Sequence, residues 1–139
     1  MHKRKLEYRM DLNKQHTVNL LIAEKDEDLA KSLELFFSDT FNVAVVNDFS
    51  AVEQSISRTH ILLLDENIID YAGIHYLQKI KKTAPHLIII VMHTVPSVNV
   101  LKQSQYKQYT DAAVYKPFEP NSLYEIITRL YKTSEIHQP

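Results

Sequence analysis

An acidic residue, Asp65, closes an otherwise apolar stretch of the chain. The sequence I-L-L-L at 61–64 runs directly into it, and the chain's only glycine, Gly73, follows a few residues later. A short apolar run bounded in this way is typical of a buried strand, and a buried strand gains nothing from a terminal charge unless its end opens onto a site. Asp65 is therefore a candidate for binding phosphate or metal, for transferring a proton, or for forming a turn.

Charged and polar residues also follow three other apolar runs. They are Glu24, Lys25 and Asp26 after residues 18–23, His93 and Thr94 after residues 87–92, and Lys116 after residues 111–115. The carboxyl ends of parallel strands lie along one edge of a sheet, where the ligand crevice of such folds opens. We therefore expect these side chains to lie in one cluster with Asp65.

The composition excludes several classes of protein. A single glycine cannot supply G-x-G-x-x-G, G-x-x-x-x-G-K-[ST] or G-x-S-x-G, which excludes the usual dinucleotide, P-loop and serine-hydrolase sites. The absence of cysteine excludes disulfides and Cys-based zinc sites, and the 7 histidines show no metal-ligand spacing. A net charge of -1 gives no general attraction to nucleic acid. The longest apolar run, residues 87–92, is too short to span a membrane, and we expect a cytoplasmic protein.

Apolar runs alternate with helical stripes along most of the chain. The predicted strands cover residues 18–23, 42–47, 61–64, 87–92 and 111–115. The predicted helices carry the following apolar stripes: Leu29, Leu33, Phe36 and Phe37; Val52 and Ile56, after a capping box of Ser50 and Glu53; Ile74, Leu77 and Ile80; Val98, Leu101 and Tyr109, after Pro96; and Leu123, Ile126, Ile127, Leu130 and Tyr131, with Pro120 in the first turn. Continuously apolar strands are buried on both faces, so the order predicts an α/β fold, (βα)5, with a doubly wound parallel sheet.

Charge and element order divide the chain into three parts. Residues 1–16 are rich in lysine and arginine and lack an apolar segment, so we expect an exposed, flexible basic arm. Residues 17–132 contain all predicted elements, and a chain of 139 residues is large enough to bury one core. Residues 133–139 are expected to form a C-terminal tail.

Four motifs together resemble the receiver domain of two-component response regulators, over about residues 17–132. They are L-L-I-A-E-K-D-E-D-L, L-L-L-D-E-N-I-I-D-Y-A-G, P-H-L-I-I-I-V-M-H-T and V-Y-K-P-F-E-P, in the order of the family. The resemblance implies a flavodoxin-like sheet of strand order 2-1-3-4-5 and phosphorylation of an aspartate by a histidine kinase, aided by Mg2+. By position, it makes Asp65 the phosphoacceptor and Lys116 the partner of the phosphoryl oxygens. It makes Glu24, Asp65 and the Asn67 carbonyl the metal ligands.

The chain departs from the family's acidic pair. The second member of that pair is replaced by Lys25, so an ammonium stands where the resemblance implies a metal-binding carboxylate. Mg2+ needs hard oxygen ligands and loses its water reluctantly, so its affinity should fall. Asp26 either restores the missing ligand or caps the helix that follows. We expect Lys25 and Lys116 to form ion pairs with Asp65.

Two further positions depart from the family's conformational switch. The expected hydroxyl residue falls on His93 when the fourth apolar run is aligned, and on Thr94 when positions are counted back from Lys116. An imidazole can hydrogen-bond the acceptor carboxylate or remain packed at the rim of the pocket. The aromatic switch residue expected three positions before the lysine is Ala113. Tyr115 lies on the same face of that strand and is a candidate to replace the missing ring.

These departures favour a degenerate receiver, a non-enzymatic signalling module that acts by binding protein partners. The alternative is a working receiver, phosphorylated on Asp65 with Mg2+. A flavin-binding electron carrier of the same topology is disfavoured, because its phosphate-binding loop would be the acidic E-K-D-E-D at 24–28.

The resemblance also implies the kind of partner. A histidine kinase or phosphotransfer protein and a downstream effector are expected, with no direct DNA binding and no membrane contact. We expect a monomer, or a weak dimer formed through the face of the fourth helix, fifth strand and fifth helix. The same face is the expected contact surface for protein partners. Residues expected on that face are Lys102, Gln103, Tyr106, Tyr115 and Glu119.

Overall fold

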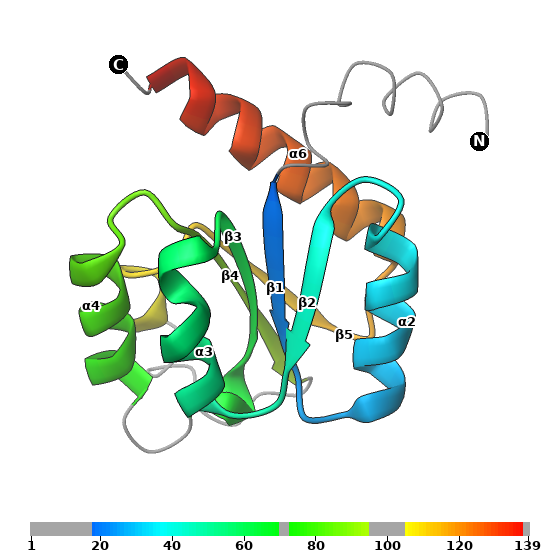
Figure 1. The fold of residues 1–139 in the computed structure, drawn as a ribbon, viewed down its shortest axis with the longest axis horizontal. Coiled ribbons are helices and arrows are strands. Elements are labelled where there is room, and N and C mark those ends of the chain that lie inside the picture. The colour runs from blue at the N-terminus through cyan, green and yellow to red at the C-terminus, as the bar shows by residue number, and fades with distance from the viewer. Residues whose placement is uncertain (1–17, 70–72, 95–104, 138–139) are drawn as a thin grey trace.

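A parallel sheet with helices on both faces organises the chain. The computed structural model describes residues 18–69, 73–94 and 105–137. The elements are β1 (Asn19–Ala23), α2 (Glu27–Phe37), β2 (Asn42–Val46), α3 (Phe49–Ser55), η2 (Ile56–Arg58), β3 (Ile61–Asp65), η3 (Glu66–Ile68), α4 (Gly73–Thr83), β4 (Ile88–Thr94), β5 (Ala112–Lys116) and α6 (Pro120–His137) (Figure 1). The predicted strands are all present, with ends that differ by one or two residues.

The sheet has the expected strand order. It contains 5 strands in the order β2-β1-β3-β4-β5, and every pair of neighbours is parallel. The strands with the longest uninterrupted apolar runs, β3 and β4, lie inside the sheet and are buried on both faces, as their hydrophobic pattern predicts. The register pairs Asp65 with Met92 and Thr94 with Lys116, so these residues lie at the same end of the sheet.

Alternate residues of the central strands pack into two hydrophobic clusters. Leu63 and Ile90 face the cluster completed by α2 and α6, whereas Leu62, Leu64 and Val91 face the cluster completed by α3 and α4. Figure 1 shows α3 and α4 together and α2 and α6 on the opposite side of the strands. These central strand residues are fully buried, so the polar residues that follow the strands are held on a rigid frame.

Two details of the helices differ from the sequence prediction. The N-cap of α3 is Asp48, whose carboxylate accepts a hydrogen bond of 2.8 Å from the Ala51 amide, and not the predicted capping box of Ser50 and Glu53. Ser50 lies inside the first turn of α3, so its hydroxyl is not at the capping position. At the other end of the chain, α6 begins at Pro120 as expected but continues to His137, into the segment predicted to be a C-terminal tail.

Some predictions concern segments beyond the described residues. The basic arm at 1–16 and most of the helix predicted after Pro96 fall there, together with Lys102 and Gln103. Among the helices that are described, none combines the length and the apolar character needed to cross a bilayer.

Candidate functional site

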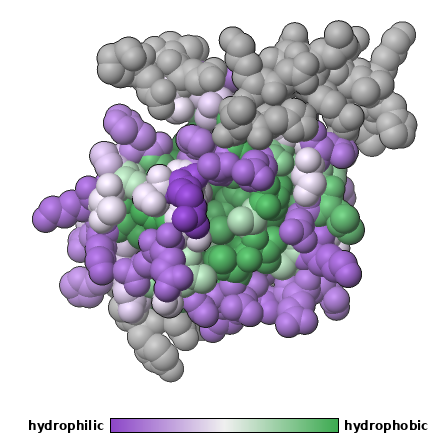
Figure 2. Space-filling model, viewed as in Figure 1, coloured by the Kyte–Doolittle hydropathy of each residue, from purple (hydrophilic) through white to green (hydrophobic). Residues whose placement is uncertain are grey.

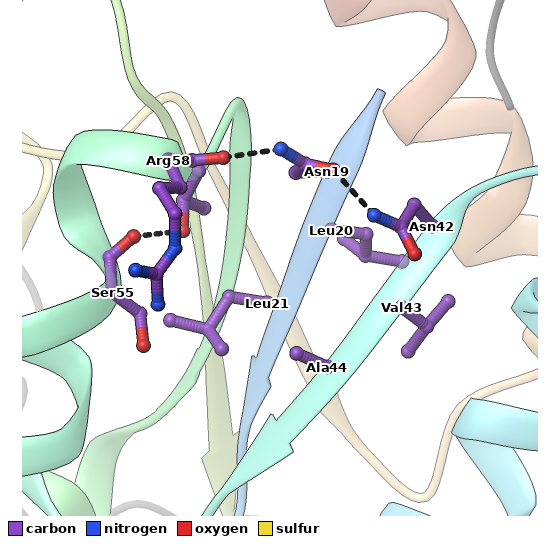
Figure 3. A pocket seen from close by; sticks show the side chains of 9 residues that line it. Asn19, Leu20, Leu21, Asn42, Val43, Ala44, Ser55 and Arg58 are labelled. Carbon is purple, nitrogen blue, oxygen red and sulfur yellow. Dashed lines mark hydrogen bonds between the residues drawn. The ribbon is translucent and has the colours of Figure 1, made fainter. Parts of the chain in front are cut away.

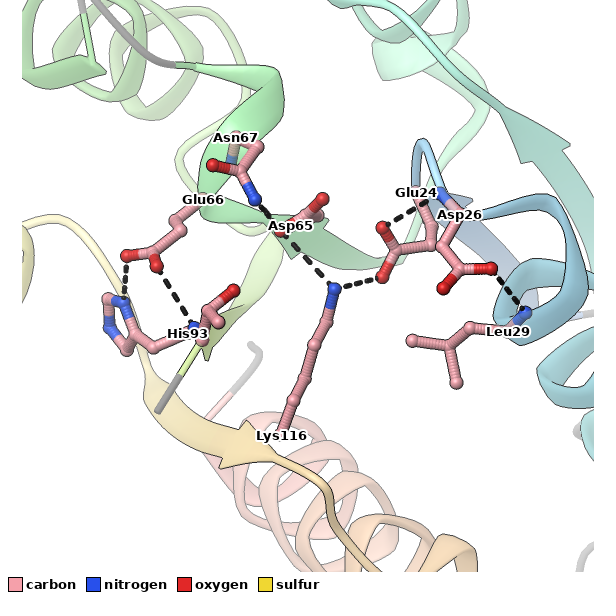
Figure 4. Close-up of polar contacts among 9 residues, drawn as sticks. Glu24, Asp26, Leu29, Asp65, Glu66, Asn67, His93 and Lys116 are labelled. Atoms are coloured by element: carbon pink, nitrogen blue, oxygen red, sulfur yellow. Dashed lines mark hydrogen bonds and ion pairs between the residues drawn. The ribbon is translucent and has the colours of Figure 1, made fainter. Parts of the chain in front are cut away.

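Two carboxylates and one ammonium meet at the carboxyl edge of the sheet. Glu24 follows β1, Asp65 ends β3 and Lys116 ends β5, and Figure 4 shows the lysine reaching between the two acids. The Lys116 Nζ contacts Glu24 Oε1 and lies 3.5 Å from Asp65 Oδ1. The two acidic side chains are 1% and 2% exposed, whereas the lysine is 19% exposed. The predicted pair of Lys116 with Asp65 is therefore present, and Glu24 shares the same cation.

Glu24 is a carboxyl group whose charge is disfavoured by its surroundings. Burial raises the pKa of Glu24, and the hydrogen bond with neighbouring Asp65 raises it further, while Lys116 acts in the opposite direction. Its Oε2 also accepts a hydrogen bond of 3.3 Å from the Asp26 amide, which fixes the turn after β1. The cluster depends on Lys116 because it is the cation that offsets two buried acids.

Neither of the two residues that follow Glu24 belongs to the cluster of Glu24, Asp65 and Lys116. Lys25 is exposed and forms no ion pair with Asp65, so the expected pair of these residues is wrong. The reason is geometric: Lys116 already approaches Asp65 from β5, whereas Lys25 extends outward from the turn. Asp26 is the N-cap of α2, and its Oδ1 accepts from the amides of Asp28 and Leu29 at 3.1 and 3.2 Å. Of the two roles considered for Asp26, the structure shows the cap.

The end of β4 is tied to the residue after Asp65. His93 is 1% exposed, and its Nδ1 lies 2.7 Å from Glu66 Oε2. The other carboxylate oxygen, Glu66 Oε1, accepts a hydrogen bond of 2.9 Å from the amide of Thr94 (Figure 4). The imidazole thus bonds Glu66 and not Asp65, while Thr94 is exposed. The role of Glu66 was not predicted from the sequence. The available signal was its position directly after Asp65, which places it at the same edge of the sheet.

Aromatic rings lie on both sides of His93. Its ring stacks on that of Tyr106 with centroids 5.9 Å apart and packs against that of Tyr115 at 5.3 Å. Tyr115 remains 45% exposed, as the sequence predicted, and Ala113 is exposed on the same strand. Tyr106 is 1% exposed, so its expected place on an open contact face is wrong.

The buried Tyr106 ring packs closely against Gly73, which has no side chain. A Cβ atom added at Gly73 would lie 2.6 Å from the Tyr106 hydroxyl, so only glycine leaves room for the ring. Gly73 therefore permits the close approach of Tyr106, whose ring stacks on that of His93. Of the other residues expected on that face, Glu119 is exposed.

Comparison with known protein families identifies the family of this chain. Residues 20–128 match the response regulator receiver domain. The chain belongs to this family. Comparison with curated proteins found no match. Receiver domains are the modules of two-component response regulators that exchange signals with kinases and effectors.

Solved structures share the receiver fold. A CheY-like receiver domain protein from Methanospirillum hungatei aligns with a TM-score of 0.76 and 21% identity, covering 87% of this chain and 98% of that one. Thermotoga maritima DrrB, an OmpR/PhoB homologue, aligns at 0.72 and 20% identity over 84% of this chain and 54% of that one. NtrX from Brucella abortus aligns at 0.75 and 19% identity over 86% of this chain and 27% of that one. The receiver thus corresponds to the whole of some relatives and to a part of others.

The pocket of this receiver is poorly suited to the Mg2+ that receiver domains typically bind. The carboxylates nearest Lys116 are those of Glu24 and Asp65, and Lys116 contacts both of them. Asn67 donates to Asp65 Oδ1 from its amide and its side chain, at 3.3 and 3.4 Å. Within the described residues, no three acidic, histidine or cysteine side chains converge as a metal site. The donor set does not fit a tightly held divalent cation.

Proposed function

We propose that this receiver domain is a non-enzymatic signalling module whose pocket is held by its own ion pairs, and that it acts by contact with protein partners. The observation that carries the proposal is the shared cation: Lys116 contacts both Glu24 and Asp65. One ammonium offsets part of the charge that a metal would otherwise neutralise. Asp26 caps α2, and among the described residues no third acidic, histidine or cysteine side chain joins Glu24 and Asp65 in a metal site.

The proposal assigns distinct roles to the neighbouring residues. Asp65 serves as an ion-pair partner, with phosphorylation weak or absent, because transfer to a carboxylate requires cations that offset charge on the phosphoryl oxygens. His93 and Glu66 fix the end of β4 in one arrangement through two hydrogen bonds. Partners are a histidine kinase or phosphotransfer protein upstream and an effector downstream.

An ordinary phosphoacceptor is the second candidate. Two observations favour it: Asp65 ends β3 at the carboxyl edge, and Lys116 lies 3.5 Å from it, where it can also pair with a phosphoryl oxygen. The two candidates differ in what happens when a small phosphodonor and Mg2+ are supplied.

Phosphorylation by acetyl phosphate separates these candidates. The protein is incubated with acetyl phosphate and Mg2+, and its intact mass is followed, with Asp65→Asn as the control. We expect no phosphoryl adduct on the native chain. Lys25→Asp puts a carboxylate next to Glu24 in the turn after β1, where the resemblance implies a metal-binding acid, so this variant should gain an adduct and a Mg2+-dependent rise in melting temperature. An adduct on the native chain that is absent from Asp65→Asn would establish the ordinary phosphoacceptor instead.

A further inference from the structure

The edge strand β2 presents free backbone groups to solvent. Asn42 donates its amide to the Val18 carbonyl and Val46 accepts from the Glu24 amide, so the backbone groups of these residues point toward the β1 side. Backbone direction alternates along a strand, and the amides and carbonyls of Val43 and Val45 therefore point away from the sheet. No strand lies beyond β2 in the described part of the chain.

This edge lacks the features that usually protect an edge strand. Its sequence is N-V-A-V-V, without charge or proline. Val45 is 36% exposed, and Asn42 and Ala44 are also exposed. Figure 2 shows a hydrophobic hollow open to solvent between α3 and α2, over β1 and β2. An uncharged, accessible strand of this kind is a template for pairing with another strand.

Both sides of β2 are hollowed. The short helix α3 leaves a cavity of about 180 Å³ beside β1 and β2, with Leu21 and Ala44 among its lining residues (Figure 3). On the opposite side, a groove of about 350 Å³ separates α2 from β2 and is lined by Glu27, Lys31 and Val45 among others. Side chains of an added strand alternate between the two faces, so each hollow has room to receive them.

The strand is complementary to itself. Val43, Ala44 and Val45 read the same in both directions. In an antiparallel pair centred on Ala44, Val43 of one copy faces Val45 of the other. Both valines point their backbone groups outward, so each facing pair exchanges two hydrogen bonds, while Ala44 faces Ala44 in a non-hydrogen-bonded pair. This self-complementarity favours a second copy of the same strand over a strand of a different sequence.

We propose that β2 pairs with β2 of a second copy of this chain about a twofold axis at Ala44, joining the two sheets edge to edge. The axis places the two α2 helices on the same face, where each rim carries both signs of charge: Lys31 lies beside Glu27 and Glu34. A lysine of one copy then meets a glutamate of the other. The surface is distinct from the face of β5 and α6, and the inference does not depend on phosphorylation of Asp65.

The expected dimer is weak and dissociates on dilution. A single strand pair with its flanking hollows buries less than the roughly 1,200 Å² total of stable interfaces. Sedimentation or light scattering over a concentration series should show a monomer–dimer equilibrium for the native protein. Val45→Lys places a charge on the open edge and should shift the protein to monomer. Thr83→Lys, at the exposed C-terminal end of α4, is the control and should leave the equilibrium unchanged.

A cysteine cross-link tests the register directly. The chain has no cysteine, so Ala44→Cys introduces one thiol. Facing Cα atoms of a non-hydrogen-bonded pair lie about 4.5 Å apart, within the range of about 4.4–6.8 Å that disulfides span. Mild oxidation should convert Ala44→Cys to a covalent dimer, whereas Thr83→Cys, also exposed, should remain monomeric. Circular dichroism and melting establish that each variant is folded.

Three results would overturn the inference. A native protein that stays monomeric at every concentration has no such interface. A dimer that survives Val45→Lys uses another surface. Equal cross-linking of Ala44→Cys and Thr83→Cys would report collisions and not a specific pair.

Discussion

Replacing Lys116 with methionine tests how one cation holds two buried carboxyl groups side by side. Methionine keeps most of the apolar length of the side chain and removes the charge. The pair of Lys116 with Asp65, at 3.5 Å, has a gross attraction of about 5 kcal/mol at an effective dielectric constant of 20. Its loss leaves Glu24 and Asp65 buried next to each other without a cation.

Protonation of one acid limits the cost of this change. Burial already raises the pKa of Glu24 from its ordinary value of 4.5, so it is the group that takes up the proton. Relative to an unfolded glutamate, binding that proton at pH 7 costs about 3.4 kcal/mol. This is smaller than the gross attraction, so we expect Lys116→Met to lose about 3 kcal/mol of unfolding free energy at pH 7. The value agrees with the roughly 3–5 kcal/mol for breaking a buried ion pair.

The unfolding free energy of Lys116→Met should depend on pH in a defined direction. The folded variant holds one more proton than the unfolded chain, so its own unfolding free energy should rise as pH falls from 7 towards 4.5. Urea denaturation at a series of pH values measures this. Near pH 7 the melting temperature should fall by roughly 6–12 °C.

A matched lysine provides the control. Lys79 pairs with Glu53 at 3.0 Å, but these side chains are 67% and 40% exposed. Lys79→Met should therefore cost less than about 1 kcal/mol, without the same dependence on pH. A loss of under about 1 kcal/mol for Lys116→Met at pH 7, or a variant whose unfolding free energy does not rise between pH 7 and 5.5, would refute the reasoning.

Three further predictions concern neighbouring residues. Because the pKa of Glu24 is raised, chiefly by burial, the native protein should lose stability as pH rises from about 4.5 through that raised pKa; Glu24→Gln should remove this part of a pH series of urea titrations. Asp26→Ala should cost about 1 kcal/mol in the same assay through loss of the α2 cap, whereas Asp26→Asn should retain most of it, and equal losses would contradict the cap. Gly73→Ala brings a Cβ to 2.6 Å from the Tyr106 hydroxyl and should cost about 1–3 kcal/mol in thermal melts. Adding Tyr106→Phe should recover part of that loss, and no recovery would show that the contact is not the cause.

The sheet and three members of the site were predictable from the sequence. Runs of buried aliphatic residues fix which segments become central strands, and parallel strands bring their carboxyl ends together. The residues that follow directly, Glu24, Asp65 and Lys116, therefore meet without further information. Their order across the sheet, β1 between β2 and β3, was confirmed.

The remaining contacts depend on side-chain directions that spacing does not define. Lys25 stands next to Glu24 in the sequence, yet it points outward from the turn. Glu66 joins His93 across 27 positions, a contact that requires the register of β3 against β4. Tyr106 is buried because the residue opposite is glycine, and no periodic pattern reports this.

The exposure of Lys25 affects how easily this position of the pocket can change by mutation. Its side chain is exposed and takes no part in the cluster around Lys116, so the fold has not adapted to require it. A lysine codon becomes a glutamate codon by a single base change. An acid at the second position of the pair therefore lies one mutational step away, at little expected cost in stability. Under the proposed function, a metal-binding acid can therefore be gained at this position without a change in the core.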